Sequence, residues 1–110
     1  MDKLDQRILG LMLEKTNRLI EICNKYSFEE IQLNYLVSDS LQYEFEKLYE
    51  DVSRLSVNFV LEYPNFPINQ LRSIRNRVAH DYASVIIRIL YDTVKVDIVS
   101  LKSQIQEILK

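Results

Sequence analysis

The chain of 110 residues has few of the residue types that cross-link or interrupt a fold. It holds one cysteine, one histidine, one glycine, two prolines and no tryptophan. A single cysteine excludes an internal disulfide, and one cysteine with one histidine cannot assemble a structural zinc site. The scarcity of glycine and proline favours long helices over a β-fold with many turns. We expect Cys23 to pack as a small buried hydrophobe and not to react.

Long apolar runs are also missing, and no stretch approaches the length of a membrane span. Asp2, Asp5 and Glu14 interrupt the N-terminal apolar residues, so we expect no signal peptide, no membrane partner and a cytoplasmic location. The net charge of -2 argues against a general nucleic-acid coat protein but permits a local basic site. A hydrophobic content of 47% suits a single compact domain over residues 1–110.

Hydrophobic residues recur at three- and four-residue steps along most of the chain, a spacing that is typical of helices. The expected helices run from Asp2 or Leu4 to Tyr26, Phe28 to Leu33, Val37 to Glu62, Pro67 to Asp81, and Val85 to Leu109. Because short connections make neighbouring helices antiparallel, the predicted fold class is all-α. Its architecture would be an up-and-down antiparallel helical bundle with an extra short helix.

Local signals predict where several of these helices begin and end. Ser27 with Glu30 three residues later resembles a capping box, and Ser84 could cap the last helix. Pro64 is expected to end the long middle helix. Residues 93–99 are rich in β-branched side chains, which could indicate a strand. The longer helical period outweighs that signal, because no partner strand is found elsewhere in the chain.

The long middle helix carries two further features. Apolar side chains at Tyr43, Tyr49 and Val60 lie off its core stripe, which indicates either a second buried face, as in a dimer, or scattered surface residues. Its carboxylates could in principle pair around a metal ion, but we interpret them as a solvated helix face and predict no metal site. These acidic residues are Asp39, Glu44, Glu46, Glu50 and Asp51.

Residues 65–82 differ from the rest of this acidic chain in their charge. No acidic residue occurs after Glu62 until Asp81. The same stretch contains the only histidine and three arginines, namely His80, Arg72, Arg75 and Arg77. Arginine offers a planar fork for phosphate, and histidine can give or take a proton near neutral pH. Although a lone histidine is usually an ordinary surface or core residue, these neighbours favour a phosphate site.

The helical period predicts where this histidine points. At about 100° per residue, Leu71, Ile74 and Val78 form one stripe, which should face the core. Asn76 and His80 are four residues apart, so they share a face that lies roughly opposite that stripe. We therefore expect the imidazole to face solvent or a partner chain.

Residues 75–82, which read Arg-Asn-Arg-Val-Ala-His-Asp-Tyr, resemble the Arg-x4-His-x-Tyr signature of HepT-like toxins in the HEPN superfamily. The preceding segment 63–67, Tyr-Pro-Asn-Phe-Pro, is similar to the proline-containing turn before the motif helix in that family. Tyr49 and Ile68 differ from the family pattern, which commonly has glycine and tryptophan there. The likeness extends over nearly the whole chain and implies a single HEPN-like helical domain.

This resemblance implies a metal-independent endoribonuclease that needs no cofactor and acts on RNA as a homodimer, with its site in the dimer cleft. His80 would handle the proton, Arg75 would stabilise the phosphate, and Asn76 would orient His80 or donate to an oxygen. Arg72 and Arg77 would be RNA-binding residues.

The resemblance also implies a toxin of a toxin-antitoxin pair. A cognate MntA-like nucleotidyltransferase would act as antitoxin by adenylylating Tyr82, which would place negative charge where the RNA phosphate binds. Alternatives stay open at this point. Tyr82 could instead pack at a helix end, and the chain could be a non-catalytic helical partner or nucleotide-binding subunit of a nucleotidyltransferase. A third hypothesis is that the chain is a purely structural helical bundle that serves protein interactions.

Overall fold

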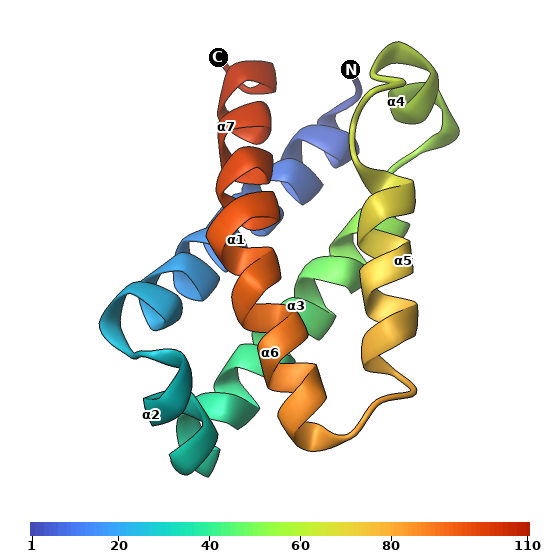
Figure 1. Cartoon of the computed structure of the whole chain (residues 1–110). Coiled ribbons are helices and arrows are strands. Elements are labelled where there is room, and N and C mark those ends of the chain that lie inside the picture. Colours follow the sequence, from blue (N-terminus) through green and yellow to red (C-terminus); the bar gives the residue numbers. More distant parts are fainter.

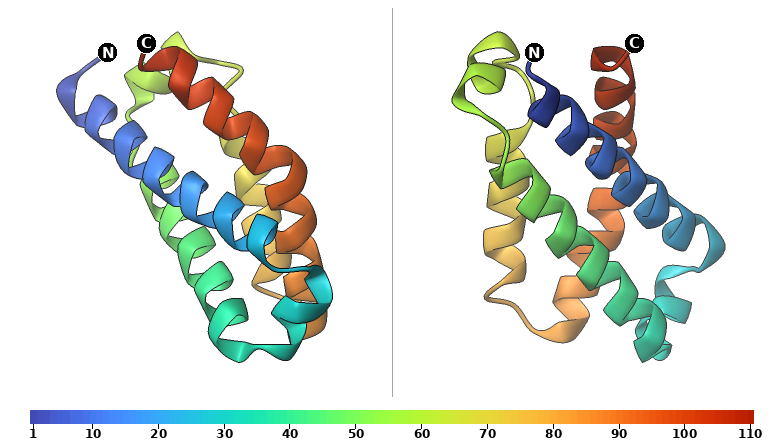
Figure 2. Two further views of the ribbon diagram at one scale, coloured as in Figure 1. Left: turned by 90° about the vertical axis from the view of Figure 1, so that its left-hand side faces the viewer. Right: turned by 180° about the vertical axis from the view of Figure 1, so that it is seen from behind.

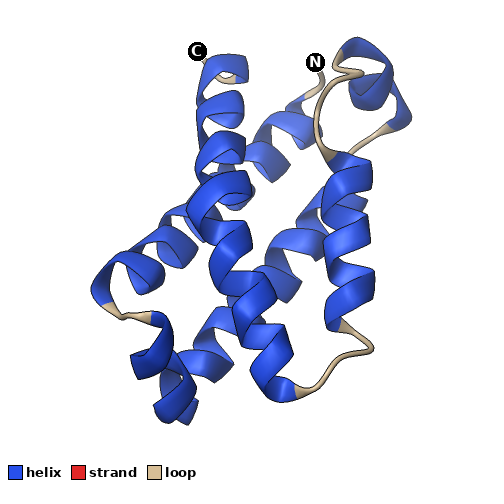
Figure 3. Ribbon diagram, viewed as in Figure 1, coloured by secondary structure: helices blue, strands red, loops and turns tan.

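Every regular element is a helix in the computed structural model, which describes residues 1–110 (Figure 1 and Figure 3). The all-α prediction is therefore confirmed. No helix combines the length and the apolar character that crossing a membrane requires. The helices are α1 (Lys3–Lys25), α2 (Phe28–Leu33), α3 (Tyr35–Ser53), α4 (Val57–Glu62), α5 (Ile68–Val78), α6 (Ala83–Thr93), the π-helical turn η1 (Val94–Ile98) and α7 (Val99–Ile108).

The long helices run up and down the molecule, and the two termini lie at the same end (Figure 1). α1 and α3 lie side by side, as both views of Figure 2 show, and α1 also contacts η1 and α7. α5 packs against α3 and α6, so it covers one side of the bundle. This arrangement confirms the predicted up-and-down bundle, but the bundle has two short helices, α2 and α4, where one was predicted. It also leaves the outer side of α5 free of other helices.

One continuous core of buried apolar side chains joins the helices. The stripe predicted on the middle helix supplies Leu41, Phe45, Leu48 and Val52, all of which are buried. Cys23 belongs to the same core with 2% of its surface exposed, as predicted. Burial raises the pKa of its thiol to about 11, because the thiolate would lose its hydration.

The prediction of one helix from Val37 to Glu62 is wrong in its middle. α3 ends at Ser53, and α4 begins only at Val57. The buried carboxylate of Asp5 on α1 accepts hydrogen bonds from the Ser56 N–H at 3.0 Å and from the Ser56 hydroxyl at 2.6 Å. The Ser56 hydroxyl in turn accepts from the N–H of Phe59 and caps α4. A contact across 51 residues therefore stabilises the break.

The interpretation of the α3 carboxylates as a solvated face is wrong for Asp51. Only 5% of this residue is exposed, and its Oδ2 lies 2.6 Å from the Nζ of Lys15 on α1. Arg54 approaches the other carboxylate oxygen at 3.8 Å. Asp39, Glu46 and Glu50 are exposed, and Glu44 is half-buried, so most of the set does face solvent. Asp51 instead joins α1 to α3.

Two predicted helix ends and one predicted helical stretch also need correction or refinement. α5 ends at Val78 and not at Asp81, because the His80 N–H donates to the Arg77 carbonyl and tightens the last turn. Ser84 does not cap the last helix, which already begins at Ala83 without a side-chain cap. The β-branched stretch is helical as predicted, but it forms the π-helical turn η1. The capping box of Ser27 and Glu30 is confirmed.

Candidate active site

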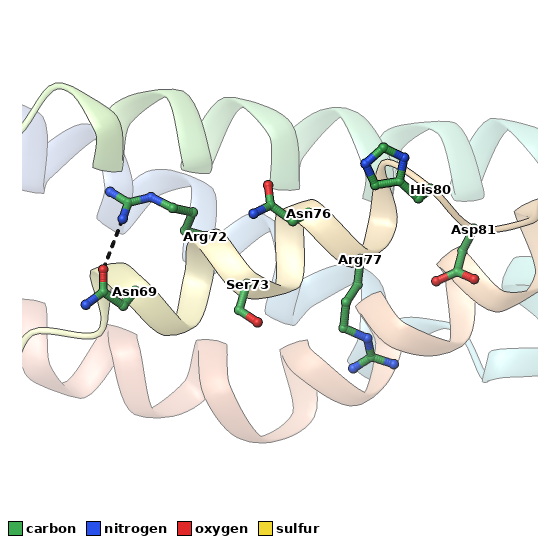
Figure 4. A pocket seen from close by; sticks show the side chains of 7 residues that line it. All are labelled: Asn69, Arg72, Ser73, Asn76, Arg77, His80 and Asp81. Atoms are coloured by element: carbon green, nitrogen blue, oxygen red, sulfur yellow. Dashed lines mark hydrogen bonds between the residues drawn. The ribbon is translucent and has the colours of Figure 1, made fainter.

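The outer side of α5 and the turn after it line an open hollow of about 610 Å³, which we call the α5 hollow (Figure 4). No apolar residue lines it. Its lining residues follow two rows at four-residue spacing along the helix. One row is Arg72, Asn76 and His80, and the other is Asn69, Ser73, Arg77 and Asp81. Four residues are about one helical turn, so each row follows the helix axis.

His80 and Asn76 point to the same side of α5, as Figure 4 shows, and both are exposed. The predicted direction of the imidazole, away from the core, is therefore confirmed. The residues of the core stripe, Leu71 and Ile74, are buried on the opposite side of the helix. His80 itself lies one residue beyond the C-cap of α5, Ala79, in the turn that leads toward α6. No hydrogen bond or ion pair within the chain engages its side chain.

The two flanking arginines that sequence reasoning assigned to RNA binding both line the α5 hollow. Arg72 is held in place by a hydrogen bond from its Nη1 to the Oδ1 of Asn69 at 3.1 Å (Figure 4). Arg77 points to the other side of the helix, where it shares a row with Ser73 (Figure 4). Neither guanidinium forms an ion pair with a carboxylate of the chain. Both are therefore free to bind an anion.

Arg75 does not line the α5 hollow, although it belongs to the same motif. Its side chain reaches toward α3, where Nη2 lies 3.9 Å from Glu46 Oε1 and Cζ lies 5.4 Å from the centre of the Tyr49 ring. Arg75 and His80 are five positions apart, which corresponds to about 140° around a helix axis. Within one chain, the structure therefore does not bring these two side chains together.

Tyr82 occupies the position before α6 and has 83% of its surface exposed. Its backbone is extended, with φ of -71 and ψ of 157. The alternative that this tyrosine packs at a helix end is wrong, because the ring contacts little of the protein. The phenol is accessible from solvent and lies two residues after His80.

Sequence reasoning missed three of the residues that line the hollow, Asn69, Ser73 and Asp81. The four-residue steps from Asn69 through Ser73 to Arg77 were available as a signal, because such steps place side chains on one helix face. Asp81 is the only acidic residue in the lining. The hollow as a whole is polar and carries more positive than negative side chains, which suits a phosphate-bearing ligand.

The chain is similar to a known protein family over most of its length. Residues 12–108 match the family described as ribonuclease HepT-like. The chain belongs to this family. The resemblance seen in the Arg-x4-His-x-Tyr segment is thereby confirmed, and with it the prediction of a ribonuclease. The matched range includes α3, α5 and every residue that lines the α5 hollow.

Relatives of this HepT-like chain are similar over most of its length. A probable ribonuclease HepT of Thermococcus cleftensis is 28% identical over 102 residues, which cover 89% of this chain and 93% of the relative. A candidate RNase of Caldanaerobacter subterraneus is 26% identical over 99 residues, covering 90% and 88% of the two chains. A candidate RNase of Methanocaldococcus jannaschii is 26% identical over 111 residues, covering 100% and 92%. No solved structure matches significantly.

Proposed function

We propose that this HepT-like protein is a metal-independent endoribonuclease that uses the 2′-hydroxyl of its RNA substrate as the nucleophile. The observation that carries the proposal is His80, which is exposed, free of partners and placed in a polar hollow beside Asn76 and two unpaired arginines. Such a histidine can exchange a proton with a bound RNA, and the arginines can bind its phosphates.

The proposed reaction needs no group from outside the protein and the RNA. His80 takes the proton of the 2′-hydroxyl, and the freed oxygen attacks the adjacent phosphorus. The bond from phosphorus to the 5′-oxygen breaks, and that oxygen receives a proton. Arg75 stabilises the negative charge of the transition state, while Asn76 orients the imidazole or donates to an oxygen. The products are a 2′,3′-cyclic phosphate and a 5′-hydroxyl.

A second copy of the chain completes this site in our proposal. Arg75 and His80 project to different sides of α5, so one chain does not present both to one phosphate. A two-fold dimer places the same surface of each copy face to face. If the two copies of α5 meet, Arg75 of one copy can approach His80 of the other. The imidazole that took the proton of the 2′-hydroxyl can then return a proton to the leaving 5′-oxygen.

We further propose that the protein is the toxin of a toxin-antitoxin pair, acts in the cytoplasm, and is silenced by adenylylation of Tyr82. Its cognate antitoxin would be an MntA-like nucleotidyltransferase. Support comes from the exposure of the phenol, which an enzyme can reach, and from its position two residues after His80. The phenol oxygen would take the adenylyl group from ATP with release of pyrophosphate, which adds a phosphate close to the α5 hollow. Its charge repels the RNA phosphate, and its bulk blocks access.

Digestion of RNA by the purified protein in the presence of a metal chelator tests the nuclease proposal. The wild type should release fragments with 2′,3′-cyclic phosphate ends, and His80→Ala and Arg75→Ala should release them far more slowly. Arg7→Ala is the matched control, because Arg7 is exposed on α1, far along the chain from the hollow. Undiminished cleavage by both site variants would refute the assignment.

Intact mass tests the second proposal, after expression with a nucleotidyltransferase encoded beside the gene. The wild type and Tyr35→Phe should gain adenylyl units, since Tyr35 is an exposed tyrosine outside the site. Tyr82→Phe should gain none. Suppressed activity at an unchanged mass would show that the partner blocks the site by occlusion.

A further inference from the structure

Arg75 is held by two neighbouring side chains of α3 and not by its own helix. Glu46 and Tyr49 are three residues apart, so they lie on the same face of α3, the face that packs beside α5. The carboxylate of Glu46 lies 3.9 Å from Arg75 Nη2, and the Tyr49 ring lies 5.4 Å from Arg75 Cζ. The guanidinium therefore has one charged neighbour and one aromatic neighbour.

The contacts with Glu46 and with Tyr49 differ in whether they occupy the N–H donors of Arg75. An ion pair uses N–H donors of the guanidinium, whereas an aromatic ring attracts the cation without accepting a conventional N–H hydrogen bond. Arg75 and Glu46 are both about half-exposed, so an RNA phosphate can compete with this carboxylate. Tyr49 is half-buried on α3, whereas Glu46 is exposed. The ring is therefore more restricted in its motion than the carboxylate. The ring can keep its contact while the donors of Arg75 turn to phosphate.

We propose that Tyr49 is a positioning residue that orients Arg75 for the transition state of RNA cleavage. This inference rests on the proposed nuclease function. The ring restricts the rotation of a long, flexible side chain before RNA arrives, so less conformational entropy is lost when the guanidinium binds the phosphate. Tyr49 itself does not touch the reacting atoms. Its effect should therefore appear in kcat more than in KM, and only while Arg75 is present.

Steady-state cleavage of one defined RNA tests this role. Tyr49→Leu should lower kcat about three- to fivefold, the size expected from a cation–π contact at a partly exposed site, while KM changes little. Tyr49→Phe should retain near-wild-type kcat, because it keeps the ring and removes only the hydroxyl. Tyr43→Leu is the matched control, since Tyr43 is an exposed α3 tyrosine whose ring lies 5.4 Å from Lys47 Nζ. It should leave kcat unchanged.

A double substitution separates positioning from a general effect on the fold. Adding Tyr49→Leu to Arg75→Ala should produce no further loss, because the group that Tyr49 orients is already missing. A loss of the same factor in both backgrounds would overturn the inference. So would a Tyr49→Phe variant as slow as Tyr49→Leu, or a Tyr49→Leu variant as fast as the wild type.

The proposed function and this inference fail in different ways. If Arg75→Ala and His80→Ala cleave as fast as the wild type, the nuclease assignment itself is refuted. If they are slow but the Tyr49 variants are normal, only the positioning role is refuted. If Tyr49→Leu does not fold, proton NMR of the wild type can test the contact between Tyr49 and Arg75. The Nε proton of Arg75, on the nitrogen next to Cζ, should be shifted upfield by the ring over which Cζ lies, and an unshifted resonance would overturn the inference.

Discussion

The contact region between α1 and α3 and the outer side of α5 both contain charged side chains, but these side chains have different partners. Between α1 and α3, Asp5 accepts two hydrogen bonds from Ser56, and Asp51 pairs with Lys15. On the outer side of α5 and in the turn after it, Arg77 and His80 are exposed and bind no side chain of the protein. Charges of the first region stabilise the fold, while those of the second are available to a ligand.

This difference separates stability from activity. Removing one partner of a buried ion pair leaves an uncompensated charge and costs several kcal/mol, whereas most exposed substitutions change stability by less than about 0.5 kcal/mol. Variants of the α1–α3 region should therefore unfold more easily, and variants of α5 should lose function while they stay folded. Four measurements test this difference between the two regions.

The largest effect is expected when Arg75→Ala and His80→Ala, which should each cleave RNA very slowly, are mixed. If the site takes Arg75 from one copy and His80 from the other, a heterodimer of Arg75→Ala and His80→Ala contains one complete pair. After subunit exchange at equal concentrations, about a quarter of wild-type activity should return, because half of the dimers carry one of two sites. RNA cleavage by the mixture measures this. No recovery in demonstrably exchanged heterodimers would show that the pair is not shared in this way.

Asp51→Ala should lower the free energy of unfolding by about 3 kcal/mol, because it leaves the ammonium of Lys15 without its partner in a mostly buried place. Urea denaturation measures the change. Asp39→Ala removes an exposed α3 carboxylate and serves as the control, with an expected change below about 0.5 kcal/mol. Equal changes in the two variants would contradict the structural role of Asp51.

Ser56→Ala should lower the free energy of unfolding by about 1–2 kcal/mol, because α4 loses its cap and Asp5 loses one of its two donors. Thermal unfolding followed by circular dichroism measures this loss. Ser53→Ala is the control, because Ser53 is the exposed last residue of α3 and its hydroxyl donates only to the Glu50 carbonyl of its own helix. A Ser56 variant as stable as that control would mean that the cap contributes little.

The smallest effect concerns Glu46, which lies at the border between the two regions. Glu46→Gln should strengthen RNA binding about two- to threefold, because a surface carboxylate no longer competes with phosphate for Arg75. Binding of an RNA analogue that lacks the attacking 2′-hydroxyl measures affinity without cleavage. Asp39→Asn removes the same charge elsewhere on α3. Equal gains in both variants would reveal a long-range charge effect and not a local contact.

Much of the fold could be predicted from the chain because helical periodicity is local. The stripe containing Leu41, Phe45 and Leu48 indicated the buried face of α3, and the structure buries all three. The interruption after Ser53 could not be predicted in the same way. Residues 54–56 carry no glycine or proline, and the stabilising carboxylate of Asp5 comes from another helix. The π-helical turn likewise lies inside an unbroken helical pattern.

The candidate site likewise has features that local spacing predicts and features that depend on contacts between helices. Spacing along α5 was sufficient to place His80 and Asn76 on the side away from the core, as Figure 4 shows. The catalytic roles of these residues and of Arg75 stay predictions until activity is measured. Spacing did not indicate that Arg75 contacts α3, since this depends on how closely two helices pack and on which α3 side chains face α5.

The order of residues alone determined the helical class of this protein, the core face of each long helix and the family to which it belongs. These properties depend on neighbours within a few turns, or on a short motif. Three other features depend on how the helices pack: Asp5 stabilises the break before α4, Asp51 is buried with Lys15, and Tyr49 lies beside Arg75. Each of these contacts joins helices that are distant in sequence, so it exists only after the chain has folded.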